Sequence, residues 1–441
     1  MIKIGVVGCG YVFDHYMESL ADNPLLELKG VAEKNKERAG VVADYFGVRV
    51  YPTTEELLAD PEIQIVVNLT EPENHYPVSK AALEAGKHVY SEKPLALTFE
   101  DAQHLVDLAK EKNLILSGAP CSVLSETAQT IWKIVEDGSI GRPQLVYAEL
   151  DDNPVYLMRP EGWRNESGAA WPYTNEYEIG CTVEHAGYYL TWLCAMFGPA
   201  TSITAFSACT APNKTDLPLD PPDSADFSVA CLTFASGVVA RLTCSIVGPY
   251  DHTLKVIGDA GIVSTRDCWH YAAPVRLEQF NQVNLNARKS RTLRGSSFLQ
   301  SLFGVRGKIQ KFASPPIPQT PKRWAELKTG RRNPIRVFTK FIKKHELVSM
   351  DFFRGVSDMA AAIEENRSPL ISADFVLHVC ELTLAMHNAG TNGAPHEIKT
   401  TFAPMPLAPQ TAKSQRRYLR PDQASSGGLL DAMIRRLHKQ S

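Results

Sequence analysis

The chain has 441 residues, of which 44% are hydrophobic, 9% aromatic and 22% charged. This is about three times the usual length of one domain, so at least two domains are expected. The composition excludes a disordered, collagen-like or disulfide-stapled chain. The formal charge of −3 gives no general affinity for nucleic acid. The charge is segregated, however: residues 281–345 carry +15 and residues 411–441 carry +5, which leaves −23 for the rest.

Nine cysteines are scattered along the chain, and none forms a Cys-x-x-Cys pair. An odd number of unclustered cysteines in a large protein favours reduced, buried thiols. No uncharged apolar run is long enough to cross a membrane, and the first residues do not form a signal-peptide pattern. We therefore expect no transmembrane segment and a cytoplasmic protein.

Residues 1–122 alternate short apolar runs with helical patterns. Apolar runs lie at 2–7, 26–32, 63–69, 88–90 and 114–116, and helical patterns at 11–20, 36–46, 53–58, 78–85 and 98–112. Thr53 or Thr54 is suited to cap the third of these helices. The nearly continuous apolar run at 63–69 is typical of a strand buried on both faces of a parallel sheet. The pattern predicts an α/β fold that begins with a Rossmann-like, doubly wound parallel sheet.

The pattern changes after residue 122. A helix is predicted at 125–136, and longer β-like runs then form two hairpins, at 228–247 and 254–264. Long amphipathic helices follow at 350–365 and 375–389. We assign residues 123–403 to an α+β domain with a large, mostly antiparallel open sheet. Residues 281–345 are read as a basic, Pro-containing insertion with a helix at 335–344, and residues 404–441 as a Pro-rich basic tail that ends in a short amphipathic helix at 429–437.

Gly8 and Gly10 follow the first predicted strand and open the first helix. Glycines at that turn let the backbone approach a pyrophosphate, whose charge lies against free N–H groups at the start of the helix. The third glycine of the usual motif is replaced by Phe13. Glu33 ends the second predicted strand, where an acid binds ribose hydroxyls and repels a 2′-phosphate. These features favour NAD over NADP, although the neighbouring Lys34 leaves NADP open.

A Glu92-Lys93-Pro94 sequence stands at the carboxyl end of a buried strand, where doubly wound sheets bind their ligands. Pro94 is suited to a cis bond that aims the lysine. Burial in a crevice is expected to lower the pKa of Lys93 and to let it bond a substrate hydroxyl.

These motifs together resemble a known family. The segment AGKHVYSEKPLA at 85–96, the segment NLTEPENH at 68–75 and the opening GVVGCG are similar to the glucose–fructose oxidoreductase / inositol dehydrogenase (Gfo/Idh/MocA) family. The resemblance implies hydride transfer between a nicotinamide and a hydroxyl or carbonyl of a sugar, cyclitol or sugar derivative, with Lys93 as a catalytic and cofactor-contacting residue. The implied cofactor-binding residues are Gly8, Gly10, Tyr11, Val12, Glu33, Lys34, Thr70, Pro72, Asn74, His75, Glu92 and Lys93.

The second domain resembles the family less closely. The family usually has an Asp-x-x-x-His or Asp-x-x-x-Tyr pair before a Phe-Gly, and counting back from Phe197-Gly198 places Glu184 and Tyr188 there. A helix would bring both to one face. His185 is a third candidate because it titrates near neutrality, but it would point about 100° away from Glu184. A competing register places Glu178 at the Asp position, and we prefer the first because it keeps the distance to Phe-Gly.

Trp163 and Arg164 resemble the family's substrate-side loop, and Tyr173 lies in an aromatic stretch suited to stacking on a sugar. The histidines show no metal-ligand spacing, so no metal site is predicted.

The resemblance also implies a homo-oligomer, a dimer or tetramer, formed through the second sheet. The basic insertion could dock on an anionic surface or an acidic partner. Two other functions stay open: an NAD-dependent glycosidase on the same scaffold, and a non-enzymatic dinucleotide sensor that controls a partner.

Overall fold

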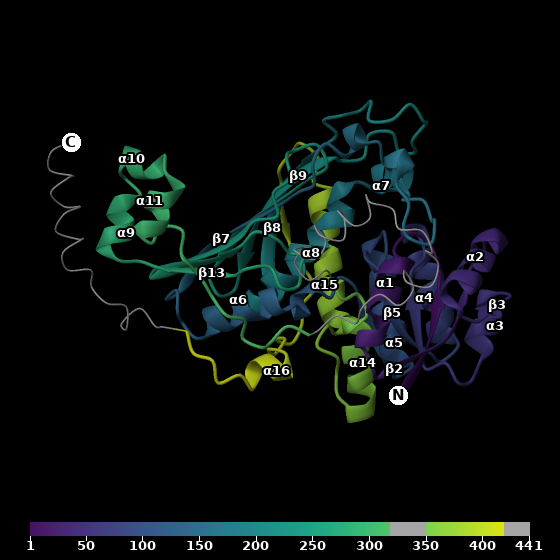
Figure 1. The fold of residues 1–441 in the computed structure, drawn as a ribbon. Helices are drawn as coiled ribbons and strands as arrows, with labels where there is room; N and C mark the ends of the chain where they lie inside the picture. The colour runs from purple at the N-terminus through teal and green to yellow at the C-terminus, as the bar shows by residue number, and fades with distance from the viewer. Residues whose placement is uncertain (318–349, 419–441) are drawn as a thin grey trace, which may run out of the picture.

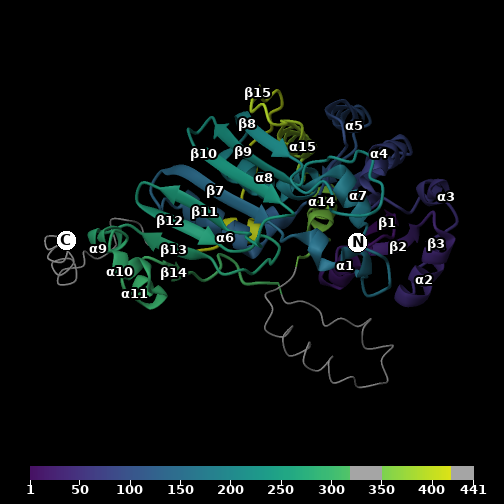
Figure 2. The same cartoon turned by 90° about the horizontal axis from the view of Figure 1, so that it is seen from above.

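The computed structural model describes residues 1–317 and 350–418. The chain forms two sheets that lie side by side, with helices packed between and around them (Figures 1 and 2). The predicted helices at 335–344 and 429–437 lie outside the described residues. Within the described residues, no helix is both long enough and apolar enough to span a bilayer.

The first sheet is wholly parallel and has the strand order β3-β2-β1-β4-β5-β6. Its strands are β1 Ile2–Val7, β2 Leu26–Ala32, β3 Val50–Tyr51, β4 Ile65–Asn68, β5 His88–Ser91 and β6 Leu116–Gly118. Its helices are α1 Phe13–Ser19, α2 Lys36–Phe46, α3 Thr54–Ala59, α4 His75–Glu84 and α5 Phe99–Glu111. All four residues of β4 are buried, as the continuous apolar run predicted. The doubly wound Rossmann sheet is thereby confirmed.

Local sequence explains where these helices begin. Asn35, Thr53 and Thr98 each accept a backbone N–H from the first turn of α2, α3 and α5, so of the two candidate caps Thr53 is the one used. Gly47 ends α2 with a φ of 67°, a conformation that glycine adopts without steric cost.

The second sheet has nine strands in the order β14-β13-β12-β11-β7-β10-β9-β8-β15. They are β7 Pro143–Asp151, β8 Ala200–Ala208, β9 Phe227–Phe234, β10 Val239–Ser245, β11 Leu254–Gly258, β12 Gly261–Thr265, β13 Arg276–Gln279, β14 Lys308–Ile309 and β15 Pro395–Glu397. All neighbours are antiparallel except β7 and β10. Both predicted hairpins, β9–β10 and β11–β12, are confirmed.

Helices cover one face of the second sheet. They include α6 Glu126–Glu136, α8 Cys181–Phe197 and α15 Ala373–His387, while α7 Tyr173–Ile179 precedes α8 at the end nearer the first sheet (Figure 1). The other face is more open: along β7, Val146 and Ala148 are fully buried, whereas Leu145 and Tyr147 are each 38% exposed. Assembly through this open face stays a prediction.

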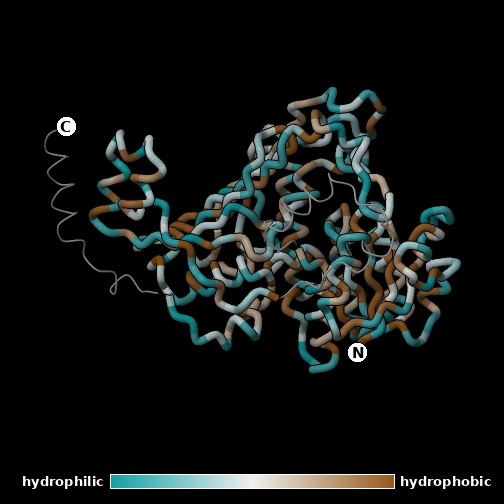
Figure 3. The backbone as a smooth tube through the Cα atoms, viewed as in Figure 1, coloured by the Kyte–Doolittle hydropathy of each residue, from teal (hydrophilic) through white to brown (hydrophobic). Residues whose placement is uncertain are grey.

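One helix late in the chain packs back on the first domain. Helix α14 Arg354–Glu365 covers the same face of the first sheet as α1, where Phe353 and Met359 join Phe13 and Tyr16 in one apolar cluster. Figure 3 shows hydrophobic segments gathered in the interior of this first domain.

The described start of the tail is not detached from the body. Residues 404–418, with α16 Pro409–Ala412, pack near α6, and Met405, Leu407 and Tyr418 are buried. The Tyr418 hydroxyl donates to the carbonyl of Lys311, so the start of the tail lies beside the described part of the basic insertion.

Candidate active site

A large cleft lies at the carboxyl end of the first sheet and continues to the second domain. Its volume is about 890 Å³, within the range of ligand sites in proteins. Ligands of doubly wound sheets bind in this crevice because the helix starts and the strand ends converge there. The residues predicted to bind a cofactor all line it: Gly8, Gly10, Tyr11, Val12, Glu33, Lys34, Thr70, Pro72, Asn74, His75, Glu92 and Lys93.

The glycine turn between β1 and α1 has the shape that a dinucleotide needs. Gly8 has a φ of 89°, and a Cβ there would lie 2.8 Å from the backbone of Leu69 and Thr70. At Gly10, by contrast, a Cβ would have no atom within 4 Å and would project into the open cleft. Gly8 therefore permits the turn, and Gly10 leaves its backbone accessible to a pyrophosphate.

Glu33 follows β2 and is fixed by two backbone donors. One carboxylate oxygen accepts from the N–H of Cys9 and the other from the N–H of Asn35, each at 2.8 Å. Lys34 is largely exposed and pairs with Glu71 at 3.2 Å. The acid rather than the lysine is therefore held beside the glycine turn, which suits ribose hydroxyls better than a 2′-phosphate.

Arg38 is a cleft residue that the sequence analysis missed. Its Nε donates to the carbonyl of Cys9 at 2.6 Å, and its two terminal nitrogens reach Ser167 and Asp14. It thus ties the glycine turn to the second domain. Its position on α2, five residues after Glu33, carried no separate signal in the sequence.

His75 lines the cleft, but both ring nitrogens already have partners. Nδ1 lies 2.6 Å from the carbonyl of Pro94, and Nε2 lies 2.9 Å from the carbonyl of Thr70. Burial lowers the pKa of His75. The ring therefore joins the loop after β4 to the loop after β5, which carries Lys93.

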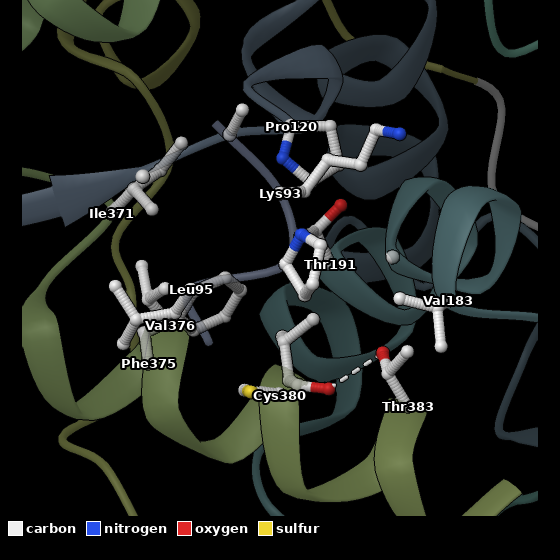
Figure 4. A pocket seen from close by; sticks show the side chains of 15 residues that line it. Lys93, Leu95, Pro120, Val183, Thr191, Ile371, Phe375, Val376, Cys380 and Thr383 are labelled. Carbon is white, nitrogen blue, oxygen red and sulfur yellow. Dashed lines mark hydrogen bonds between the residues drawn. The ribbon is translucent and has the colours of Figure 1, made fainter. Parts of the chain in front are cut away.

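Lys93 is held by its neighbours along that second loop. The Lys93–Pro94 bond is cis, as predicted, and the N–H of Lys93 donates to Glu92 at 3.0 Å. Behind it, Leu95, Phe375 and Val376 leave a void of only about 20 Å³. Figure 4 shows the Lys93 side chain extending away from this apolar cluster. The backbone is therefore closely packed, while the ammonium group reaches the cleft.

The ammonium of Lys93 forms an ion pair with Glu184 of α8. Both side chains are mostly buried, at 19% and 12% exposure. Burial acts to lower the pKa of Lys93, but Glu184 together with the nearby Tyr188, Glu92 and Glu176 outweighs it, and the pKa lies above its ordinary value. Our expectation of a lowered pKa is therefore wrong, because the sequence did not show that a carboxylate would lie against this lysine.

Tyr188 and His185 also line the cleft, together with Glu184. His185 donates from Nδ1 to the carbonyl of Cys181 at 3.0 Å and stacks on Trp269. Burial and the charge of Lys93 lower the pKa of His185 to about 4, so its ring is neutral at pH 7. Glu184 and His185 both line the cleft, so their different directions on the helix keep neither of them out of the site.

Two buried acids near this group were not predicted. Asp152 follows β7, and burial together with the charge of Asp267 raises its pKa to about 7. Glu176 lies on α7, where burial and the charge of Glu184 raise its pKa well above the ordinary value. The end of a predicted strand could have indicated Asp152, but nothing in the sequence distinguished Glu176 from its neighbours.

The substrate-side loop is only partly as predicted. Trp163 lines the cleft and packs against Trp171, with ring centroids 4.9 Å apart. Arg164 and Tyr173 are not among the lining residues, which corrects both predictions. The guanidinium of Arg164 turns back to the carbonyls of Glu161 and Trp163, and Tyr173 packs on Tyr177.

The structure also distinguishes the two ways of aligning the second-domain pair with the family pattern, because only one of the two candidate acids lines the cleft. Glu178 does not line the cleft; its carboxylate instead accepts the N–H of Asp220 at 3.1 Å. The spacing to Phe-Gly therefore located the cleft-facing acid, Glu184, correctly.

Family models match both halves of this architecture. One, described as an oxidoreductase family with an NAD-binding Rossmann fold, matches residues 2–119, and another, the GFO/IDH/MocA C-terminal domain, matches residues 128–264. The chain belongs to the Gfo/Idh/MocA oxidoreductase family. It is thus a member of an oxidoreductase family and carries an NAD-binding Rossmann domain.

Similar members of the Gfo/Idh/MocA family include proteins of known and unknown activity. An uncharacterised oxidoreductase of Synechocystis is 27% identical over 59% of this chain and 70% of its own length. The mouse trans-1,2-dihydrobenzene-1,2-diol dehydrogenase is 24% identical over 63% of this chain and 77% of its own. For three further relatives the alignments cover 46% to 56% of the relative's length.

Among solved structures, the WlbA dehydrogenase of Bordetella pertussis, in complex with NADH and UDP-GlcNAcA, has a TM-score of 0.61. It is 17% identical, and the match covers 90% of this chain and 98% of that one. At this identity the likeness supports the fold of both domains.

Proposed function

We propose that this protein is an NAD-dependent dehydrogenase of a sugar or cyclitol hydroxyl, and that Lys93 contacts the reacting oxygen. The observation that carries the proposal is the Lys93–Glu184 ion pair, which lies with Tyr188 in the cleft that begins at the glycine turn. The NAD that Gly8, Gly10 and Glu33 would hold supplies a hydride acceptor when bound.

The side chains at this end of the cleft divide the remaining work. The ammonium of Lys93 donates a hydrogen bond to the substrate oxygen and stabilises negative charge that develops there. The carboxylate of Glu184 keeps the Lys93 side chain protonated and holds its ammonium group in position. The hydroxyl of Tyr188 is held in its protonated form, because burial raises its pKa, and donates to the same oxygen or a neighbouring one.

The proton released from the hydroxyl needs an acceptor near Lys93. Neutral His185 has Nε2 3.9 Å from a carboxylate oxygen of Asp152. Because the pKa of His185 is low, it takes up a proton only transiently. It is therefore suited to pass the proton on to Asp152, whose pKa of about 7 allows uptake and release near neutrality.

The charge of the lining favours an uncharged or amine-bearing substrate. Among the described residues beyond the glycine turn, the Lys93 ammonium is paired with Glu184, and the raised pKa values of Asp152 and Glu176 keep these two acids partly or wholly protonated at pH 7. A phosphate or uronate would find Lys93 already paired with Glu184, and the Arg38 guanidinium already bound to Cys9, Ser167 and Asp14. Trp163 and Trp171 offer apolar faces for the C–H groups of a sugar ring.

The first test is cofactor binding followed by a substrate panel. We expect tryptophan fluorescence to report saturable NADH binding, and NADH formation from NAD with free sugars, cyclitols or amino sugars. The kcat/KM for glucose 6-phosphate, glucuronate and UDP-glucose should be about a hundredfold lower than that for the best uncharged or amine-bearing compound.

The panel also distinguishes the alternatives. Failure to bind NADH at millimolar concentration would overturn the assignment as a whole. Release of a sugar from a glycoside without net NADH would instead select an NAD-dependent glycosidase. Binding without turnover of any polyol, combined with NADH-dependent capture of a partner, would select a sensor.

Glu33 is expected to set the preference for NAD. Glu33→Gln removes the negative charge and keeps an acceptor for only one of the two backbone N–H groups, so the ratio of kcat/KM for NAD to that for NADP should fall about tenfold. Glu37→Gln, an exposed acid at the start of α2, is the matched control and should leave the ratio unchanged. An unaltered ratio in Glu33→Gln would remove this residue from cofactor discrimination.

A further inference from the structure

Three short helices project from the outer end of the second sheet. They are α9 Gln282–Ala287, α10 Arg291–Arg294 and α11 Ser297–Leu302, and they connect β13 to the edge strand β14. Figures 1 and 2 both show them at the end of the molecule farthest from the first sheet. We call residues 281–309 the helical arm.

The helical arm is attached firmly to the sheet. Asn281 and Asn284 form a reciprocal capping box at the start of α9, and Asn284 also donates to the carbonyl of Gln279 in β13. Arg288 forms an ion pair with the buried Glu278 and reaches the carbonyl of Val305, beyond α11. The arm is therefore presented in a defined orientation.

Large apolar side chains are exposed on the helical arm. Phe298 and Leu302 are 72% and 63% exposed and stand four residues apart, on one face of α11. Ile309, on the edge strand, is 60% exposed. Single exposed apolar residues are common, but neighbouring ones at this exposure mark a surface that contacts an apolar partner.

The same segment is strongly cationic. Residues 281–309 contain six lysines and arginines and no aspartate or glutamate, and Arg291 and Arg294 lie on α10, directly before the apolar face. Apolar side chains flanked by cations suit an anionic lipid surface, where apolar groups enter the acyl boundary and cations lie among the phosphates. A nucleic acid would match the charge but leave Phe298 and Leu302 without an apolar environment.

We propose that the helical arm docks this protein on a membrane surface rich in anionic phospholipid. Phe298 and Leu302 insert below the headgroups, and the flanking arginines bind the lipid phosphates. Because the arm lies at the far end from the first sheet, docking leaves the cofactor cleft open to solvent.

Co-sedimentation of the full chain with vesicles tests this proposal. We expect about tenfold more protein to pellet with vesicles of phosphatidylcholine containing about 30% phosphatidylserine than with phosphatidylcholine alone. The double variant Phe298→Gln, Leu302→Gln should lose most of this binding. Leu217→Gln, a 50% exposed leucine on a loop outside the arm, is the matched control and should bind like the wild type.

NADH binding, measured on every variant, should stay unchanged and shows that the variants are folded. Equal pelleting of the wild type with both kinds of vesicle would overturn the proposal. Full vesicle binding by the double variant would also overturn the proposal, because cations elsewhere in the chain would then account for the binding. The wild type could also fail to pellet with vesicles and instead form a larger, salt-sensitive oligomer that the double variant does not form. That result would show that the arm contacts a second copy of the chain rather than a membrane.

Discussion

Replacing Lys93 by methionine is expected to lower kcat/KM about a thousandfold, with little effect on NADH binding. Methionine keeps an unbranched apolar stem but removes the ammonium that we place against the reacting oxygen. Loss of one preorganised donor at a developing negative charge costs about this much. Initial rates of NADH formation and a fluorescence titration of NADH measure the two effects separately.

Lys80→Met is the matched control for this variant. Lys80 lies on α4 and pairs with Glu84 at the surface, at 3.9 Å, so the same chemical change there should leave kcat/KM unaltered. If Lys93→Met retains turnover while it binds NADH normally, Lys93 has no role in the reaction. If Lys93→Met shows no cooperative melting and does not bind NADH, this variant is not folded. Lys93→Arg, which keeps the positive charge, then separates the effect on folding from the effect on the reaction.

Replacing Glu184 by glutamine should affect both activity and stability. Without this carboxylate, less opposes the effect of burial, which disfavours the charged form of Lys93. The pKa of Lys93 therefore falls relative to the wild type. We expect kcat/KM to drop about a hundredfold. We also expect the free energy of unfolding at pH 7 to drop by about 3 kcal/mol, because a mostly buried charge loses its partner.

The pH dependence of that stability loss has a defined sign. In the wild type the folded-state pKa of Lys93 is raised, so the pair stabilises the fold fully below the ordinary lysine pKa of 10.5. This contribution is lost as the pH rises through the raised value. The difference between wild type and Glu184→Gln in urea unfolding should therefore be largest near neutrality and shrink above pH 10.5.

Glu84→Gln is the corresponding surface control. It removes the partner of an exposed lysine at i, i+4 and should change the free energy of unfolding by no more than about 0.5 kcal/mol. A loss of the same small size in Glu184→Gln would show that the ion pair with Lys93 contributes no more than a surface pair. An unchanged kcat/KM would remove Glu184 from the site.

The sequence by itself determined the first domain and its half of the cleft. Short apolar strands, capped helices and the glycine turn are set by neighbours along the chain, and a parallel sheet brings its strand ends to one edge. The position of Lys93 after a buried strand was therefore sufficient to place it in the cleft. The spacing from Phe-Gly likewise placed Glu184 and Tyr188 on one face of α8.

The tertiary structure alone decided which charges meet. Lys93 and Glu184 are 91 residues apart, and only the packing of α8 against the loop after β5 shows that their pairing raises the pKa of the lysine. The same packing brings Asp152 and Glu176 into the cleft and turns Arg164 and Tyr173 out of it. Local patterns fix backbone conformation, whereas the environment of an ionisable side chain depends on residues distant in the chain.

The uneven distribution of charge along the chain is a second example of what the sequence and the tertiary structure each decided. The sequence revealed a cationic segment within an acidic protein, but it read residues 281–345 as an insertion apart from the sheet. In the structure, the described part of that segment forms the helical arm and adds β14 to the second sheet through pairing with β13. Charge can be counted along a chain, but the surface on which it appears depends on long-range strand pairing, and this pairing leaves Phe298 and Leu302 exposed beside the arginines.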